Sequence, residues 1–521
     1  MQAFSTRLLG LLLCNAILLL PGCNSIGKTS LANRWDSEAN ATIVGAKEHP
    51  IPQPEVIGSV NGLLDVALEA APAKVTVAGR TFLSNVYNSS YIPPVLKAKR
   101  GDKVRIKLVN NIGTADIMID KPQFTNLHYH GMNITPQEPG DNVFVLVPPA
   151  LSGSDPMHGI TQSPYLKDNT YTYEYAVPKD HPQGLHWYHS HTHGYGEDQV
   201  LSGMSGLLVI DGYIEQHYPE LNTLQRKTFL LKDIALPDTK DGDPKTKTIN
   251  GTIGATETIR PGEWQVWNLA NIGADSFFEF VVDGHKFWML ARDGNVIENP
   301  EEETSVLLPP AARAVIAIQG NKPGLYGIRS LDVDTGPAGD DNSQVVLASL
   351  KIEGQPVTED ATLAPRLLRP AAKIASIHPR AEDLKKMPIT RQRVIEFSET
   401  SDGKTFFINR KQYQHDRIDT EVKLGDVEEW TVRNVTGERH VFHIHQLDFL
   451  VKEINHDDQD STGLRDTIDV PYQFDGAPGE VKLIVPFTNP NIVGKFVYHC
   501  HILEHADNGM MANIVVKKST K

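Results

Sequence analysis

Residues 425–434 read Gly-Asp-Val-Glu-Glu-Trp-Thr-Val-Arg-Asn, a turn dipeptide followed by a run in which apolar and polar side chains largely alternate. The same ten-residue frame recurs at 101–110 as Gly-Asp-Lys-Val-Arg-Ile-Lys-Leu-Val-Asn and at 262–271 as Gly-Glu-Trp-Gln-Val-Trp-Asn-Leu-Ala-Asn. Alternation after a turn is typical of a half-buried strand. The spacing from glycine to asparagine never changes, so the sequence predicts three copies of one β-module.

A second repeated element lies near the end of each copy, four residues after a glycine. It reads Tyr-His-Ser-His at 188–191, Ile-Arg-Ser-Leu at 328–331 and Tyr-His-Cys-His at 498–501. Abundant Gly and Pro with short β-branched runs predict an all-β chain of two-sheet Greek-key β-sandwich domains. We place the domains at 56–213, 214–375 and 376–521, and expect a short helix only at 381–387.

Length, composition and charge agree with an exported, soluble three-domain protein. The 521 residues suit about three domains, and 40% hydrophobic with 22% charged residues is ordinary for a globular chain. A net charge of −14 argues against nucleic acid as a partner. Residues 1–23 resemble an export leader, with Arg7 before an apolar stretch, and 24–55 read as a linker. We therefore expect a periplasmic or cell-envelope protein.

Cysteine usage singles out one residue. Cys14 and Cys23 belong to the leader, where Leu-Pro-Gly-Cys at 20–23 resembles a lipoprotein cleavage box and leaves a lipid anchor at Cys23 open. Cys500 is then the only thiol in the body of the chain, so no disulfide framework is expected there. A lone cysteine is often a buried apolar residue, but this one lies between His499 and His501.

The remaining histidines fall in matched groups in the first and third copies, whereas the middle copy keeps the scaffold without them. Because side chains alternate along a strand, His499 and His501 share one face and Cys500 takes the other. By the same alternation His440 faces away from His443 and His445. The groups are His128 and His130; His189 and His191; His440, His443 and His445; and His499, His501 and His505.

This donor set favours copper. Cys500, His440 and His505, with Met510 as a weak axial thioether, form the His2Cys and Met set of a blue copper site. Zinc also binds His and Cys, but a closed tetrahedral zinc site would not explain eight further histidines in matched pairs. Those eight suit a cluster of three copper ions between the first and third copies.

The segments 127–131, 186–191, 440–445 and 499–505, together with Met510, resemble the four copper motifs of the multicopper oxidases, a laccase-like family. The resemblance covers the chain from about residue 75 and implies three cupredoxin-like domains and four copper ions. It assigns His128 and His443 to the type 2 copper and His440, Cys500, His505 and Met510 to the type 1 copper. The type 3 pair would take His130, His189, His191, His445, His499 and His501.

The resemblance also implies a reaction. Electrons from a small reductant would reach Cys500, pass through His499 and His501, and reduce dioxygen to water with protons relayed by Asp141. Phenols and aromatic amines are the default reductants, with ferrous or manganous ions left open, and we expect a monomer. Several bacterial relatives carry Glu after the last type 1 histidine, where this chain has Ala506 and then Asp507. A copper nitrite reductase and a non-enzymatic binding protein, either a copper buffer or a copper-free cupredoxin-like interaction module, are the alternative classes.

Overall fold

The computed structural model describes residues 49–113, 123–150, 163–212, 216, 218–240, 243–358, 380–459 and 463–518. The expected leader, including Cys23, and most of the expected linker lie outside the described residues. Among the residues described, no helix combines the length and apolar character needed to cross a membrane.

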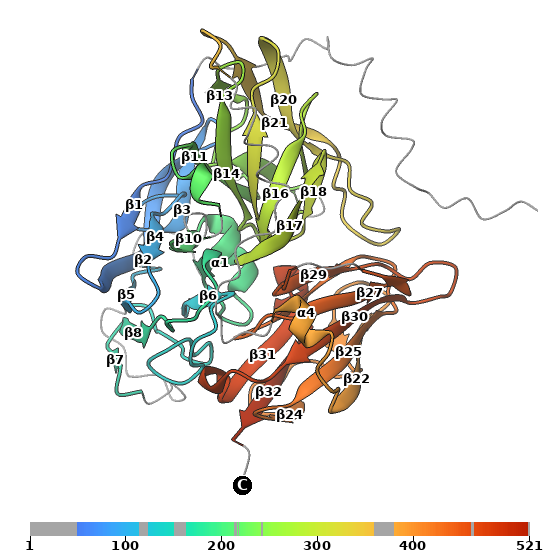
Figure 1. The fold of residues 1–521 in the computed structure, drawn as a ribbon. Coiled ribbons are helices and arrows are strands. Elements are labelled where there is room, and N and C mark those ends of the chain that lie inside the picture. Colours follow the sequence, from blue (N-terminus) through green and yellow to red (C-terminus); the bar gives the residue numbers. More distant parts are fainter. Residues whose placement is uncertain are drawn as a thin grey trace, which may run out of the picture. The chain divides into compact units, whose positions relative to one another are not determined.

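In the described part of the chain the strands form six β-sheets, two for each repeat (Figure 1). In the first repeat one sheet has the order β1 (Val56–Gly58), β4 (Val95–Ala98), β10 (Ser205–Ile210), β9 (Gly184–His189) and β6 (His128–His130). Its partner sheet has the order β3 (Arg80–Tyr87), β2 (Leu63–Val77), β5 (Lys103–Asn110), β8 (Thr170–Ala176) and β7 (Leu166–Lys167).

The second and third repeats follow the same plan. In the second repeat one sheet has the order β12 (Thr246–Ile249), β11 (Gln225–Ile234), β14 (Trp264–Asn271), β19 (Arg313–Gln319), β16 (Phe287–Arg292) and β17 (Asn295–Glu303). Its partner sheet has the order β13 (Ala255–Ile259), β21 (Val345–Ile352), β20 (Gly324–Leu331), β15 (Phe278–Val282) and β18 (Ser305–Leu308). In the third repeat one sheet has the order β23 (Phe406–Ile408), β22 (Arg391–Glu399), β25 (Val427–Asn434), β30 (Gly479–Pro486), β27 (Leu450–Ile454) and β28 (Asp457–Asp458). Its partner sheet has the order β24 (Thr420–Lys423), β32 (Met511–Lys517), β31 (Gly494–Cys500), β26 (His440–Ile444) and β29 (Thr467–Val470).

Each repeat pairs the same strands in parallel. In one sheet these pairs are β2 with β5, β11 with β14 and β22 with β25. In the other they are β4 with β10, β13 with β21 and β24 with β32. Parallel neighbours need a crossover connection rather than a hairpin. The predicted all-β, two-sheet architecture is therefore confirmed, while the exact domain boundaries stay a prediction.

The repeated asparagine explains why the ten-residue frame is visible in the sequence. Asn110, Asn271 and Asn434 are fully buried at the end of β5, β14 and β25. The Nδ2 group of Asn434 donates to the carbonyl oxygens of Glu438 and Pro471, and its Oδ1 accepts the N–H two residues further on. The other two asparagines make the equivalent bonds. Each asparagine thus fixes the same corner of its sandwich.

The described helices are short. They are α1 (Gly196–Ser202), α4 (Ala381–Leu384) and α5 (Leu503–Asp507), with the 3-10 turns η1 (Pro219–Leu221) and η2 (Pro490–Ile492). Only α4 was expected from the sequence. Asp275 in the second repeat accepts the N–H groups of Leu503 and Glu504, so tertiary contacts rather than local sequence hold α5 in place.

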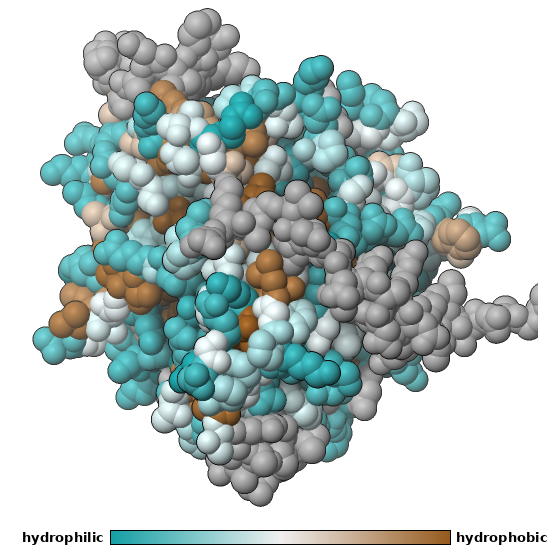
Figure 2. Space-filling model, turned by 90° about the horizontal axis from the view of Figure 1, so that it is seen from above, coloured by the Kyte–Doolittle hydropathy of each residue, from teal (hydrophilic) through white to brown (hydrophobic). Residues whose placement is uncertain are grey.

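Apolar side chains fill a core within each repeat and a shared core between the first two repeats. In the shared core, Trp187 and Leu207 pack with Leu230, Val266 and Leu290. The face in Figure 2 is mainly hydrophilic, with its hydrophobic residues dispersed. Some polar side chains are nevertheless buried, and histidine is the most frequent residue type among those described.

Candidate metal centre

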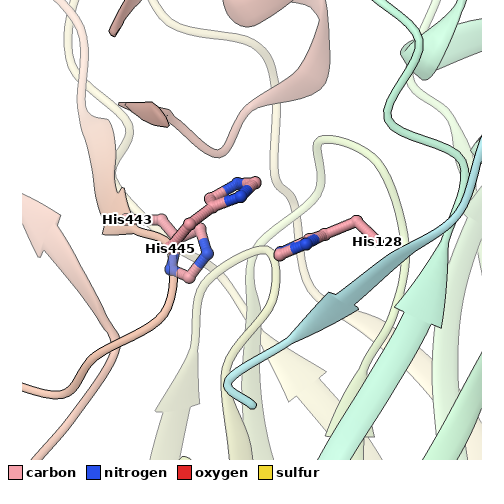
Figure 3. A group of neighbouring side chains, drawn as sticks. All are labelled: His128, His443 and His445. Carbon is pink, nitrogen blue, oxygen red and sulfur yellow. The ribbon is translucent and has the colours of Figure 1, made fainter. Parts of the chain in front are cut away.

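Two pairs of strands bring the predicted histidines together. In the first repeat β6 pairs with β9, which places His128 opposite His189. In the third repeat β26 pairs with β31, which places His443 opposite His499. Figure 3 shows His128 reaching from β6 toward His443 and His445 on the third repeat. All eight histidines of this cluster are buried; His191 is the most exposed, at 9%.

The rings from the two repeats interleave. His128 stacks on His445 with centroids 3.8 Å apart and planes inclined by 12°, and His130 stacks on His443 at 3.8 Å and 14°. Three sets of imidazole nitrogens lie within 4.8 Å of one another: His128, His443 and His445; His128, His130 and His189; and His191, His445 and His499. The cluster is therefore complete only where the two repeats meet.

Hydrogen bonds on the outer nitrogens orient several of these rings. The Nδ1 atoms of His189, His443 and His499 each lie 2.7 Å from a backbone carbonyl oxygen. Such a bond requires the proton on Nδ1, which leaves the Nε2 lone pair directed into the cluster. The ring orientation is thus set by the surrounding backbone.

The inner nitrogens suit a metal ion. Within the described residues no hydrogen-bond partner is found for Nε2 of His128, His189 or His443, for Nδ1 of His130 or His445, or for either nitrogen of His501. A buried polar atom without a partner costs about 1–3 kcal/mol, so this many in one place indicates a bound ligand. Burial lowers the pKa of His443 to about 3 and that of His128 well below its usual value. The imidazoles are therefore neutral, which is the form that binds metal.

A second donor group lies on the other face of β31. The Nδ1 atoms of His440 and His505 are 3.7 and 3.6 Å from Cys500 Sγ. Burial raises the pKa of the Cys500 thiol to about 12, so a thiolate here needs a cation beside it. His440 lies with Cys500, as the alternation of side chains predicted. This set has the donors of a blue copper site.

Met510 is held next to this group by its backbone. Its carbonyl oxygen accepts the N–H of Cys500 at 3.1 Å, and its own N–H donates to the carbonyl oxygen of His505 at 2.9 Å. The Met510 side chain is fully buried in the same core as Cys500. A thioether in this core is available as a weak donor.

Asp141 is buried next to the histidine cluster. Its carboxylate is buried and accepts from His128 Nδ1 at 3.0 Å, from the N–H of Tyr129 and from Gln446 Nε2 at 2.6 Å. Burial raises the pKa of Asp141 to about 7. Asp507, the other candidate acid, instead accepts the N–H groups of Gly194 and Glu197 next to α1.

Three charged side chains near the histidines were not predicted from the sequence, because they belong to none of its repeated patterns. Asp466 contacts His130, and Arg313 from the second repeat contacts Asp466. Glu438 Oε1 lies 3.4 Å from His505 Nε2 at the edge of a cavity of about 580 Å³. The acidic side chains lining this cavity are Asp275, Asp340, Glu399, Asp402, Glu438 and Glu504.

The middle repeat lacks the donors. On β15 and β20, the corresponding strands of the second repeat, Phe280 pairs with Ser330 and Val281 pairs with Arg329. Phe278 and Phe280 are fully buried in the core of that repeat. The same strands therefore serve packing in one copy and a metal centre in another.

Comparison with known proteins agrees with this geometry. Family models described as multicopper oxidase match residues 70–213, 213–351 and 386–520. The chain belongs to the multicopper oxidases, which makes it a copper-dependent oxidoreductase that couples oxidation of a reductant to reduction of dioxygen. It carries four copper ions and consists of cupredoxin-like domains, as predicted.

Several relatives span nearly the whole chain. A multicopper oxidase of Staphylococcus aureus is 28% identical over 476 residues, covering 88% of this chain and 90% of the relative. A laccase of Bacillus subtilis is 22% identical over 485 residues, covering 82% and 88%. The solved structure of a multicopper oxidase from Campylobacter jejuni, described as a metallo-oxidase, is similar with a TM-score of 0.70 and 24% identity, covering 91% of this chain and 96% of that one.

Proposed function

We propose that the two donor groups are the electron-entry and dioxygen-reducing centres of this oxidase. His440, Cys500, His505 and Met510 hold the type 1 copper, and His128 and His443 hold the type 2 copper. Bound copper supplies the one-electron steps and the storage of four electrons that dioxygen reduction requires. The type 3 pair is held by His130, His189, His191, His445, His499 and His501. The observation that carries this proposal is the convergence of partnerless imidazole nitrogens in a buried space.

The two centres are joined by the backbone of β31. Cys500 belongs to one donor group, and its chain neighbours His499 and His501 belong to the other. The His499 Nδ1–H also donates to the carbonyl oxygen of Cys500 at 2.7 Å, which adds a hydrogen-bonded route to the covalent one. We assign Cys500, His499 and His501 the role of conducting electrons from the first centre to the second.

The reductant is proposed to bind in the acidic cavity beside His505. Six acidic side chains and the guanidinium of Arg439 line it, and His505 with Phe406 forms part of its wall. Burial raises the pKa of Glu438 to about 9, so that carboxyl is neutral near pH 7 and the negative charge comes from the other acids. The centroids of the Phe406 and His505 rings lie 4.2 Å apart in a stacked arrangement. A lining with more acidic than basic side chains favours cationic reductants, such as protonated aromatic amines or ferrous and manganous ions, over neutral phenols. The description of the Campylobacter jejuni relative as a metallo-oxidase supports this preference.

Asp141 is proposed to orient His128. Its carboxylate holds the His128 Nδ1–H, which leaves Nε2 facing the cluster, and Gln446 of the third repeat fixes the carboxylate in turn. The catalytic role expected for Asp141 as a proton relay stays a prediction.

Export is the second part of the proposal. The leader at 1–23 and an acidic surface support a periplasmic or cell-envelope monomer acting on a small reductant, without nucleic acid. Mass spectrometry of the mature N-terminus tests this directly. A chain beginning with a lipidated Cys23 establishes an anchor, whereas an intact Met1 contradicts export.

The copper assignment is tested by a copper count, the visible spectrum and oxygen uptake on the same preparation. We expect an intense blue absorption and oxygen consumption with ferrous ion, manganous ion and an aromatic amine. One or two copper ions without oxygen uptake would favour the nitrite reductase or copper-binding alternatives.

A further inference from the structure

Arg313 opens β19 in the repeat that holds no candidate ligand, yet its side chain ends at the histidine cluster. It is fully buried, and it donates to both oxygens of Asp466, from Nη1 to Oδ1 at 2.7 Å and from Nη2 to Oδ2 at 2.6 Å. Its Nε donates to the carbonyl oxygen of Leu185 in the first repeat, and Nη1 also donates to that of Ala311. The guanidinium thus contacts all three repeats.

Asp466 holds one histidine from each copper-binding repeat. Its Oδ1 lies 3.1 Å from His130 Nε2, and its backbone oxygen lies 2.7 Å from His443 Nδ1. These are the two rings that stack at 3.8 Å across the repeats. With Nε2 of His130 engaged by Asp466, Nδ1 is the nitrogen left to face the cluster, and it has no partner among the described residues.

The space for this ion pair is made by a glycine. A Cβ at Gly131 would lie 2.5 Å from Asp466 Oδ2 and 2.6 Å from Arg313 Nη2, and Gly131 has a φ of 81°. Any side chain there would displace the pair. The residue after His130 is therefore adapted to the Arg313–Asp466 contact.

The bidentate contact does more than neutralise charge. Asp466 lies close enough to His130 and His443 for all three to approach a single metal ion. A carboxylate free to turn could become a ligand itself, whereas the planar guanidinium fork fixes both of its oxygens. Held by Arg313, the Asp466 side chain and backbone orient His130 and His443, and the carboxylate does not compete with them for the metal ion.

We propose that Arg313 is a positioning residue of the copper cluster, and that through Asp466 it sets the ring orientations of His130 and His443. The repeat without copper ligands would then determine the ligand geometry of the other two. This inference rests on the proposed function, in which both histidines bind copper.

The test compares Arg313→Lys and Arg313→Gln with matched controls at Arg329, a second-repeat arginine whose Nε contacts both oxygens of Asp283 away from the cluster. Copper retention is measured by chelator competition on the loaded enzyme, together with the blue absorption and the share of copper visible by electron paramagnetic resonance. We expect roughly 10- to 100-fold weaker retention of cluster copper in the Arg313 variants. The paramagnetic share should rise as the coupled pair is disturbed, the blue absorption should stay, and Arg329→Lys and Arg329→Gln should match the parent.

Arg313→Lys keeps the charge but replaces the fork by a single point contact, so it decides the question if Arg313→Gln does not fold. Parent-like retention and paramagnetic share in a folded, blue Arg313→Lys would overturn the proposal. A parent protein that lacks the blue absorption, or binds fewer than four copper ions, would instead refute the proposed function, whatever the variants do.

Discussion

The Nδ1 atoms of His440 and His505 lie 3.0 Å apart, although one residue is on β26 and the other is on the helix α5. Cys500 Sγ completes the triangle from β31. The outer nitrogens of the two rings face Thr436 Oγ1 and Glu438 Oε1. The three inner donors are therefore fixed from separate elements before any ion binds, which makes single replacements at this site informative.

Cys500→Ser should abolish the blue absorption, because that colour requires a copper thiolate. The cluster histidines belong to the other donor group and should keep most of their copper. Oxidation of the reductant should stop, since electrons no longer enter. Absorption spectra and copper counts on parent and variant check this, and a persistent blue band would contradict the assignment of Cys500.

Replacing His443 and His445 together with Ala should give the opposite result. Both residues contribute nitrogens to the cluster, whereas the donor group that contains Cys500 is completed by His440 and His505. The blue colour should remain while oxygen uptake is lost. An oxygen electrode and a visible spectrum on the same sample separate the two effects. Parent-rate oxygen consumption would show that the division of ligands between the faces is wrong.

Met510→Leu should raise the reduction potential of the blue site, because a thioether donates weakly to the oxidised ion and leucine does not. The volumes are similar, so the loss of stability should stay under about 1.5 kcal/mol. Redox titration of the blue absorption measures the change. A potential equal to or below that of the parent would remove Met510 as the axial group.

Neutralising part of the acidic cavity tests the preference for cations. The double variant Glu399→Gln and Asp340→Asn should raise KM for ferrous ion by roughly tenfold, equivalent to about 1.4 kcal/mol. A neutral phenol should be almost unaffected, and the effect should shrink as salt is added. The exposed Asp416→Asn serves as control. Equal changes for both reductants would show that charge does not select the substrate.

Lys232 should make stability depend on pH. Burial lowers its pKa from 10.5 to about 7 in the folded chain. Between these two pH values the unfolded chain binds one more proton, so the free energy of unfolding rises with pH at about 1.4 kcal/mol per unit. Lys232→Met should remove this rise, whereas the exposed Lys240→Met should keep it. Urea unfolding at pH 7 and 9 measures the difference.

Much of the fold and the site follows from patterns that repeat within the chain. The frame ending at Asn110, Asn271 and Asn434 is visible because each copy builds the same buried corner. Alternation along β31 separates Cys500 from its neighbours because a strand has only two faces. Both inferences depend on local backbone geometry, which can be predicted from the spacing of residues in the sequence.

Contacts between residues far apart in the sequence produce no repeated pattern from which they could be predicted. Arg313 and Asp466 are 153 residues apart and meet only when all three repeats have packed. The helix α5 is too short to show helical periodicity, and its first N–H groups are held by Asp275 from another repeat. The acidic cavity likewise combines residues of the second and third repeats.

The shared strand β31 also has a consequence for assembly. A shift of its pairing by a single residue would turn Cys500 toward the histidines and turn His499 and His501 away from them. Both centres would then fail together, and no partly correct arrangement would keep one of them. Copper uptake would therefore act as a checkpoint on strand register, so that only correctly paired chains become fully metallated.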